Sequence, residues 1–74
     1  MEFSFDKVVN ALYLQFSREI IQSSEEIVES IIIDYGQDEN LIGIEILNFT
    51  KKKLNLNKLI QMSEEEIIPM IVQC

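Results

Sequence analysis

The sequence predicts an α+β fold: a small antiparallel β-meander of four or five strands, followed by one or two short C-terminal helices. In several segments up to residue 50, apolar residues recur at every second position, and many of them are isoleucine, a β-branched residue suited to strands. After residue 53 the apolar period becomes helical. The 74 residues are expected to form one domain, with a β-meander core over 1–50 and a helical extension over 51–74.

The first two strands are expected to form a hairpin. Residues 11–16 alternate between the two faces of a strand, and one serine separates Phe3 from Phe5 in the same rhythm. Residues 2–6 and 10–17 are therefore predicted to pair with each other.

The segment that follows is compatible with two structures. Ser23 and Glu26 fit a helical capping box, whereas the β-branched residues and the neighbouring strand patterns favour an extended chain. We prefer the extended interpretation, a strand over residues 19–28.

The strongest signal is a hairpin over residues 31–48. Two β-branched runs, 31–35 and 41–47, flank a polar segment. A four-residue loop at 37–40 places the strongly apolar side chains on one face, whereas a slip of one residue would scatter them over both faces. The pairs predicted on this face are Tyr35 with Ile42, Ile33 with Ile44, and Ile31 with Ile46. The opposite face is half apolar, so another part of the protein is expected to cover it.

Two short helices are expected after the strands, at residues 55–62 and 64–68. Asn55 or Asn57 can cap the first helix by accepting backbone N–H groups.

The second helix is expected to start at a capping box formed by Ser63 and Glu66. Pro69 is expected to end this helix, because proline has no backbone N–H to donate. The tail at 70–72 is then expected to pack on the sheet or to add to its edge.

The charge of the chain limits its partners. Thirteen acidic residues against six basic ones give a net charge of −7. Because nucleic acids and anionic membranes attract lysine and arginine, direct binding to either is not expected. A small basic protein is the partner that this charge favours.

The size of the chain favours self-association. A domain this small buries only about 60% of the surface that its unfolded chain exposes. Since 47% of the residues are apolar, some apolar surface is expected to remain for a second copy to cover. A homo-oligomer, most simply a dimer, is therefore expected.

The residue types disfavour catalysis. There is no histidine, which is the commonest general base and zinc ligand, and two glycines cannot form a phosphate-binding loop. The single cysteine, Cys74, is a poor candidate for a nucleophile. No enzymatic activity, cofactor or metal is expected. Without a signal sequence or an apolar run of about 20 residues, the expected location is the cytoplasm.

Six residues are candidates for an interaction surface. Acidic side chains can meet a basic partner, and a tyrosine can anchor an interface because its ring is apolar and its hydroxyl is polar. The candidates are Tyr13, Glu25, Glu26, Glu29, Asp34 and Glu45.

Asp34 and Glu45 are expected to share one face of the second hairpin, with Asp34 across from Gly43 and Ile32 across from Glu45. Two such carboxylates could bind a divalent cation or share a proton. We prefer a structural interpretation, in which they are surface charges that discourage aggregation of the sheet.

Several blocks occur in a recognisable order: Phe5-Asp6, residues 10–14, Ser24-Glu25-Glu26, Ile33-Asp34-Tyr35 and residues 41–47. From Phe3 to Lys51 the chain resembles the short prokaryotic proteins of the domain-of-unknown-function family 2283. The resemblance implies a fold and no mechanism, because the family has no established activity. Some members look like antitoxins against small basic toxins, which implies a neutralising protein–protein contact here.

Three departures from the family pattern stand out. Asn10 replaces a usual aspartate, Val8 and Val9 replace a more polar pair, and Glu39 stands where a turn glycine is expected.

Three functions follow, in order of preference. The first is a small interaction protein, antitoxin-like, that binds a basic protein. The alternative is a homo-oligomeric structural domain without catalytic activity. The last is a metal-dependent enzyme that uses Asp34 and Glu45.

Overall fold

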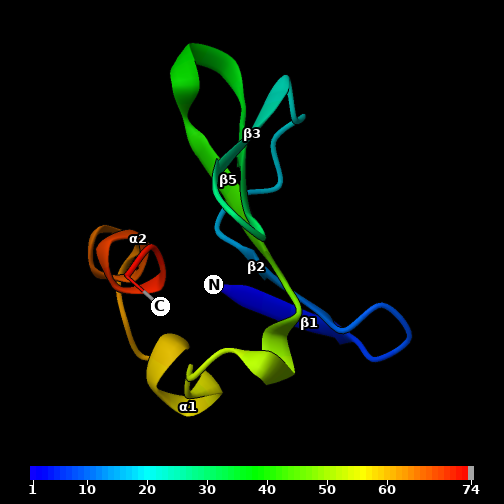
Figure 1. Cartoon of the computed structure of the whole chain (residues 1–74). Coiled ribbons are helices and arrows are strands. Elements are labelled where there is room, and N and C mark those ends of the chain that lie inside the picture. The colour runs from blue at the N-terminus through cyan, green and yellow to red at the C-terminus, as the bar shows by residue number, and fades with distance from the viewer. Residues whose placement is uncertain (74) are drawn as a thin grey trace.

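A five-stranded antiparallel sheet with two short helices on one of its faces makes up the computed structural model, which describes residues 1–73 (Figure 1). The strands are β1 (Glu2–Asp6), β2 (Ala11–Gln15), β3 (Ser23–Val28), β4 (Ile31–Tyr35) and β5 (Leu41–Leu47). The helices are α1 (Leu56–Leu59) and α2 (Glu64–Ile71), and the 3-10 turns are η1 (Gln37–Glu39) and η2 (Phe49–Lys51). The predicted α+β class, a sheet followed by helices, is confirmed.

The strands lie in the order β1-β2-β5-β4-β3. β3, β4 and β5 form a meander, and the β1–β2 hairpin joins it because β2 pairs with β5. β5 therefore lies in the middle of the sheet, with a paired strand on each side, and Ile42, Ile44 and Ile46 are buried. β1 and β3 are the two edge strands.

The predicted N-terminal hairpin is confirmed, although β2 is shorter than the predicted strand over 10–17. Its turn is held by Asp6, whose Oδ1 accepts the backbone N–H of Val8 at 2.9 Å. An aspartate that accepts a backbone N–H two residues ahead stabilises a tight turn of this kind.

Asn10 fastens this turn to η2. Its side-chain Nδ2 donates to Thr50 Oγ1 at 2.8 Å, and its Oδ1 accepts the backbone N–H of Thr50 at 3.2 Å. An aspartate at this position could accept but could not donate, so the departure from the family pattern has a structural reason. Asn10 also adopts a φ of 56°, a left-handed conformation that asparagine tolerates well.

β4 and β5 pair in the predicted register over most of their length, which keeps the isoleucines on one face. The confirmed pairs are Ile31 with Ile46, Ile32 with Glu45, Ile33 with Ile44, and Asp34 with Gly43.

The prediction that Tyr35 lies opposite Ile42 is wrong. A register shift precedes Tyr35, which lies opposite Leu41, so Ile42 is the extra residue of a β-bulge. The backbone carbonyl of Ile42 accepts the N–H groups of Phe16 and Ser17, at 2.7 and 3.2 Å. The chain that leaves β2 thus bonds to the bulged residue, and this contact joins segments far apart in the sequence.

β3 is shorter than the predicted strand over 19–28. The N–H of Gln22 bonds to the carbonyl of Tyr35 at 2.8 Å, but the residues before it do not belong to the strand. Ile20 is 83% exposed. The N-terminal part of the prediction is wrong because β4 ends at Tyr35, so this part of the chain has no strand to pair with.

The face of the sheet toward the helices holds the core. Side chains of β2, β4 and β5 meet those of α1 and α2 there, and both helices lie on this one side of the sheet (Figure 1). The buried cluster comprises Leu12, Leu14, Ile31, Ile33, Ile44, Ile46, Leu59, Ile67 and Ile71. We call this side of the sheet the inner face.

α1 is a single turn, shorter than the predicted helix over 55–62. Of the two predicted caps, Asn55 is the one used: its side chain accepts the backbone N–H groups of Asn57 and Lys58. Leu59, the last residue of α1, is fully buried.

α2 starts as predicted, since the carboxylate of Glu66 accepts the backbone N–H and the hydroxyl of Ser63, both at 3.0 Å. The prediction that Pro69 ends the helix is wrong, because the helix continues to Ile71. Ile67 and Ile71 are both fully buried. Burying each contributes about 1.5–3 kcal/mol, which offsets the roughly 3 kcal/mol that an interior proline costs. No helix within residues 1–73 is long and apolar enough to cross a membrane.

Candidate functional site

The face of the sheet away from the helices, the outer face, is the candidate site. Residues directly opposite each other on antiparallel strands share a face, so the register identifies its members. One row across the sheet is Glu2, Gln15, Gly43, Asp34 and Ser24, and the next is Ser4, Tyr13, Glu45, Ile32 and Glu26. Acids and hydroxyl groups therefore dominate this face.

Tyr13 reaches across the outer face from β2 to β4. Its hydroxyl donates to Asp34 Oδ2 at 3.0 Å, and the hydroxyl of Ser24 donates to Asp34 Oδ1 at 2.5 Å. Asp34 is only 9% exposed, and both of its carboxylate oxygens accept these bonds. Hydrogen bonds to an ionised acceptor are strong, and here they offset the cost of burying the carboxylate.

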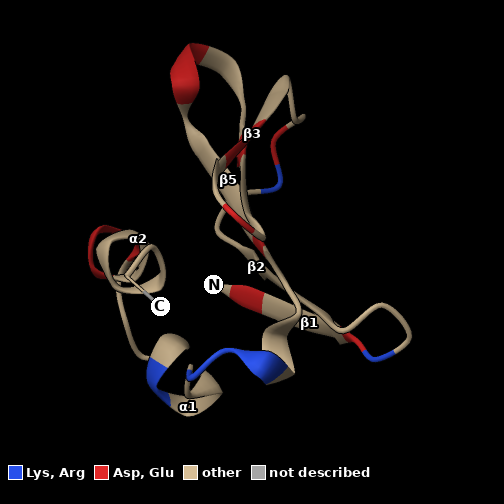
Figure 2. Cartoon of the chain, in the orientation of Figure 1, with Lys and Arg blue, Asp and Glu red and all other residues tan. Residues whose placement is uncertain are grey.

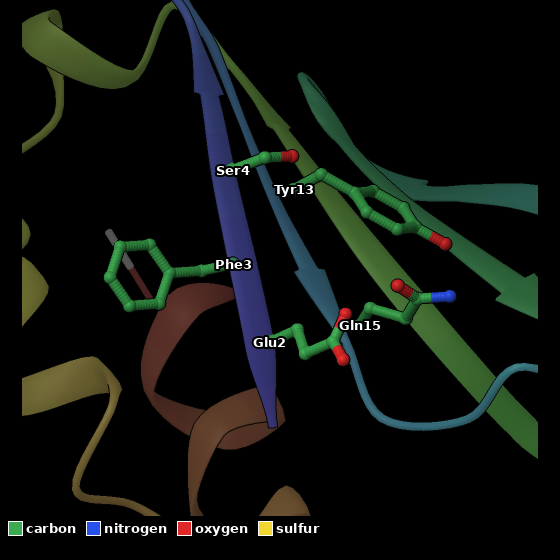
Figure 3. Close-up of a pocket in the computed structure, with 5 residues that line it drawn as sticks. All are labelled: Glu2, Phe3, Ser4, Tyr13 and Gln15. Carbon is green, nitrogen blue, oxygen red and sulfur yellow. The ribbon is translucent and has the colours of Figure 1, made fainter.

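Gly43 makes this reach possible. The ring of Tyr13 extends over β5, as Figure 3 shows, at the position where Gly43 has no side chain. A Cβ atom at residue 43 would overlap the hydroxyl and ring of Tyr13, and would lie 3.0 Å from the carbonyl oxygen of Leu14. A glycine in the middle of a strand weakens it, so the close approach of the ring is the reason for this glycine.

The surroundings of Tyr13 change its acidity. Burial, the hydrogen bond to Asp34 and the negative charges of Asp34 and Glu45 together raise the pKa of Tyr13 to about 12. Each of these effects disfavours the tyrosinate. The hydroxyl therefore stays protonated near neutral pH and remains a donor to Asp34.

Asp34 and Glu45 share the outer face, as predicted, with Asp34 opposite Gly43 and Glu45 opposite Ile32 in the neighbouring row. Asp34 is engaged by Tyr13 and Ser24, which gives it a structural role in holding the tyrosine ring. Within residues 1–73, no three acidic, histidine or cysteine side chains are grouped so that they could hold a metal ion. Cys74 lies outside the described residues.

The three acids proposed near β3 do not share one surface. Glu26 lies on the outer face, whereas its neighbour Glu25 lies opposite Ile33, on the inner face. Glu29 is in the turn between β3 and β4, where the carboxylate of Glu26 accepts the backbone N–H of Ser30 at 3.0 Å.

A shallow hollow of about 80 Å³ lies on the outer face beside Tyr13. It is lined by Glu2, Phe3, Ser4, Tyr13 and Gln15. Figure 3 shows that the ring of Phe3 lies on the other side of β1 from Ser4 and Tyr13. Small-molecule sites have volumes of roughly 300–1,000 Å³. The hollow therefore fits a side chain of a partner better than a separate ligand.

Acidic and basic residues occupy different parts of the protein. The five strands contain no lysine or arginine and six acidic residues: Glu2, Asp6, Glu25, Glu26, Asp34 and Glu45. Figure 2 shows positive charge gathered at the end of the molecule that holds α1. Lys51 belongs to η2 and Lys58 to α1, and Lys52 and Lys53 lie in the segment between them. The guanidinium of Arg18 pairs with Glu2. The sheet thus presents a negative surface, and the main group of positive charges lies away from it.

Two features of this site were not anticipated from the sequence. Ser24 was not identified as a partner of Asp34, and Tyr13 was not connected to it. The available signal was Gly43, because a glycine inside an apolar strand indicates a close approach by another group. Which group approaches depends on the pairing of β2 with β5.

These observations define a small α+β protein whose antiparallel sheet has one face covered by helices and one open, acidic face. A family model described as "Protein of unknown function (DUF2283)" matches residues 2–49. The chain belongs to this family, and the resemblance inferred from its sequence is confirmed. The match contains all five strands but neither helix. No curated protein and no solved structure matches the chain.

Gly43→Val is expected to lower the free energy of unfolding by about 1–3 kcal/mol, because the valine side chain would overlap the ring of Tyr13. Chemical denaturation measures this change. In a double-mutant cycle, Tyr13→Ala should reduce the cost of Gly43→Val, since it removes the overlapping group. A cost that is the same in both backgrounds would contradict the contact.

The pKa of Tyr13 can be measured by absorbance in a Tyr35→Phe background, which leaves one tyrosine. A midpoint of about 12 is expected, and Asp34→Asn should lower it. Because the folded pKa lies above the ordinary value of 10.0, the stabilisation from protonated Tyr13 is complete below pH 10.0 and is lost as the pH rises through about 12. Tyr13→Phe should remove this alkaline loss. An ordinary midpoint in the parent would contradict the buried hydrogen bond.

Proposed function

We propose that this protein is a small cytoplasmic interaction protein that binds a basic protein through the outer face of its sheet and catalyses no reaction. The observation that carries the proposal is that five of the six acidic strand residues lie on the outer face and that no strand residue is basic. The five are Glu2, Asp6, Glu26, Asp34 and Glu45. Opposite charge on a partner would steer it to this surface and fix its orientation.

Tyr13 provides the anchor of the proposed interface. Its hydroxyl is fixed by Asp34, so the ring has little rotamer freedom left to lose when a partner binds. Glu45 lies directly opposite Tyr13, and Glu26 lies in the same row of the outer face. Tyrosine is one of the residue types that most often contribute a large share of the binding energy at protein–protein interfaces. The fixed ring of Tyr13, with charged residues beside it, suits this role.

An antitoxin-like role is the most specific form of this proposal. The resemblance to family members that look like antitoxins implies a small basic toxin as the partner. The net charge of −7 and the open acidic face support such a contact, because complementary charge speeds association with a basic protein and disfavours other partners.

A homo-oligomeric structural domain is the second candidate, favoured by the apolar residues at the β1 edge. The exposed apolar side chains there are Met1, Phe3, Phe5, Val8 and Val9. An edge strand can pair with its own copy about a two-fold axis. Acids on the outer face would repel a second copy, so we place this contact at the β1 edge and not on the outer face.

The partner can be tested with the product of an adjacent gene that encodes a short basic protein. The two proteins should co-elute at low ionic strength, and salt should weaken the complex because exposed charges are screened. Glu45→Lys should weaken binding by about tenfold, or 1.4 kcal/mol. The matched control Glu65→Lys, at an exposed acid of α2, should bind like the parent. Failure to co-elute at low salt removes the proposal.

Self-association can be tested by light scattering across a range of concentrations. A dimer is expected at high concentration, and Phe5→Glu should shift it to monomer because a carboxylate would enter the apolar contact. A parent protein that stays monomeric at all concentrations rules out the second candidate.

A further inference from the structure

We infer that the basic partner adds an extended strand to the free edge of β3 and inserts an arginine into a hollow between β3 and η1. The inference rests on the proposed function and adds the place and the chemistry of the contact. Glu26 connects the two surfaces, because it lies on the outer face and belongs to the edge strand.

β3 has a free hydrogen-bonding edge. One side of the strand pairs with β4, and no strand within residues 1–73 pairs with the other side. The residues from Ser23 to Glu26 are all exposed, and their pairing with β4 is regular up to a shift between Glu26 and Val28. An extended peptide can continue the sheet along such a stretch, with backbone hydrogen bonds supplying affinity and side-chain pockets supplying specificity.

A hollow of about 380 Å³ lies beside the start of this edge. It is lined by Ser23, Ser24, Glu25, Tyr35 and Glu39. Ser23 lies opposite Tyr35, and Glu25 is two residues further along β3, so Glu25 and Tyr35 belong to the same face of the sheet. β3, β4 and η1 thus bring two carboxylates and one aromatic ring to one hollow.

The two carboxylates of the hollow are exposed and have no protein partner within the described part of the chain. Neither Glu25 nor Glu39 has a hydrogen bond or an ion pair through its side chain there. A guanidinium can bond to carboxylates in a fork geometry and stack on a tyrosine ring. A lysine ammonium offers only a point charge, so arginine fits this set of groups best.

Glu39 occupies a backbone conformation that disfavours its residue type. Its φ is 60°, in the left-handed region where a glycine would be unstrained. Acidic residues along β3 can be explained by the need to keep an edge strand from aggregating. This explanation does not extend to Glu39, which lies in η1 and not on the edge strand. The carboxylate of Glu39 is exposed and lines the hollow, where it can bond to a cation.

The probe for this inference is a short capped peptide of alternating valine and threonine with one central arginine. Added to the isotopically labelled protein, it should shift the backbone amide resonances of residues 23–26 and slow their hydrogen exchange. The same peptide with citrulline in place of arginine keeps the backbone and removes the charge. It should bind about tenfold more weakly, because the charge-assisted hydrogen bonds are lost.

Two matched variants separate binding from folding. Glu39→Gly relieves the left-handed backbone, so it should be at least as stable as the parent, yet it should bind the arginine peptide about tenfold more weakly. Asp38→Gly relieves the same kind of strain at the preceding residue, where φ is 57°, and Asp38 does not line the hollow. It should bind like the parent. Equal binding by Glu39→Gly and the parent overturns the inference.

The position of the resonance shifts distinguishes this inference from the proposed function. Shifts confined to the outer face around Tyr13 and Glu45 would overturn the β3 contact and support the proposed function. No shift anywhere would also overturn the β3 contact, while co-elution with the neighbouring-gene product decides the proposed function independently.

Discussion

Apolar side chains at alternate positions of β2, β4 and β5 all fall on the inner face of the sheet, and this face has to be covered. Residues 1–73 form no second sheet that could do so, and α1 and α2 supply the cover. Neither helix is strong by itself, since α1 is one turn and α2 contains Pro69. Short helices gain their stability mainly from packing. The contact with the sheet therefore stabilises the two helices, and the helices in turn shield the inner face of the sheet from water.

Because both helices lie on one side, the outer face stays open and has to be ordered without an apolar core. The bonds from Tyr13 and Ser24 to Asp34 do this by joining β2 and β3 to β4. The ring of Tyr13 crosses β5 where Gly43 leaves space. The same tyrosine thus stabilises the sheet and supplies the rigid aromatic group of the proposed interface. Stability and binding are coupled through one side chain.

The two edges of the sheet differ in chemistry, and this difference separates the two proposed associations. β1 carries half-exposed Phe3 and Phe5, which suit contact with an apolar surface such as a second copy. β3 carries Glu25 and Glu26, which disfavour pairing with an identical strand and favour a basic one. A dimer through β1 would leave β3 free. Self-association and binding of a basic partner are therefore compatible.

The sequence by itself determined the features that depend on neighbouring residues. The alternation of isoleucines predicted the β4–β5 hairpin and the pairs Ile31 with Ile46 and Ile33 with Ile44. Side-chain period is a local property, and a slip would have exposed the whole apolar face. The capping box at the start of α2 was equally local.

The tertiary structure decided what depends on contacts between distant segments. The strand order, with β2 beside β5, brought Tyr13 over Gly43 to Asp34. At the β-bulge, the carbonyl of Ile42 accepts backbone N–H groups from the chain that follows β2. In α2, burial of Ile67 and Ile71 stabilises the helix enough for it to continue beyond Pro69. None of these can be read from a local period, because each depends on which surfaces meet once the hairpins and helices have packed together.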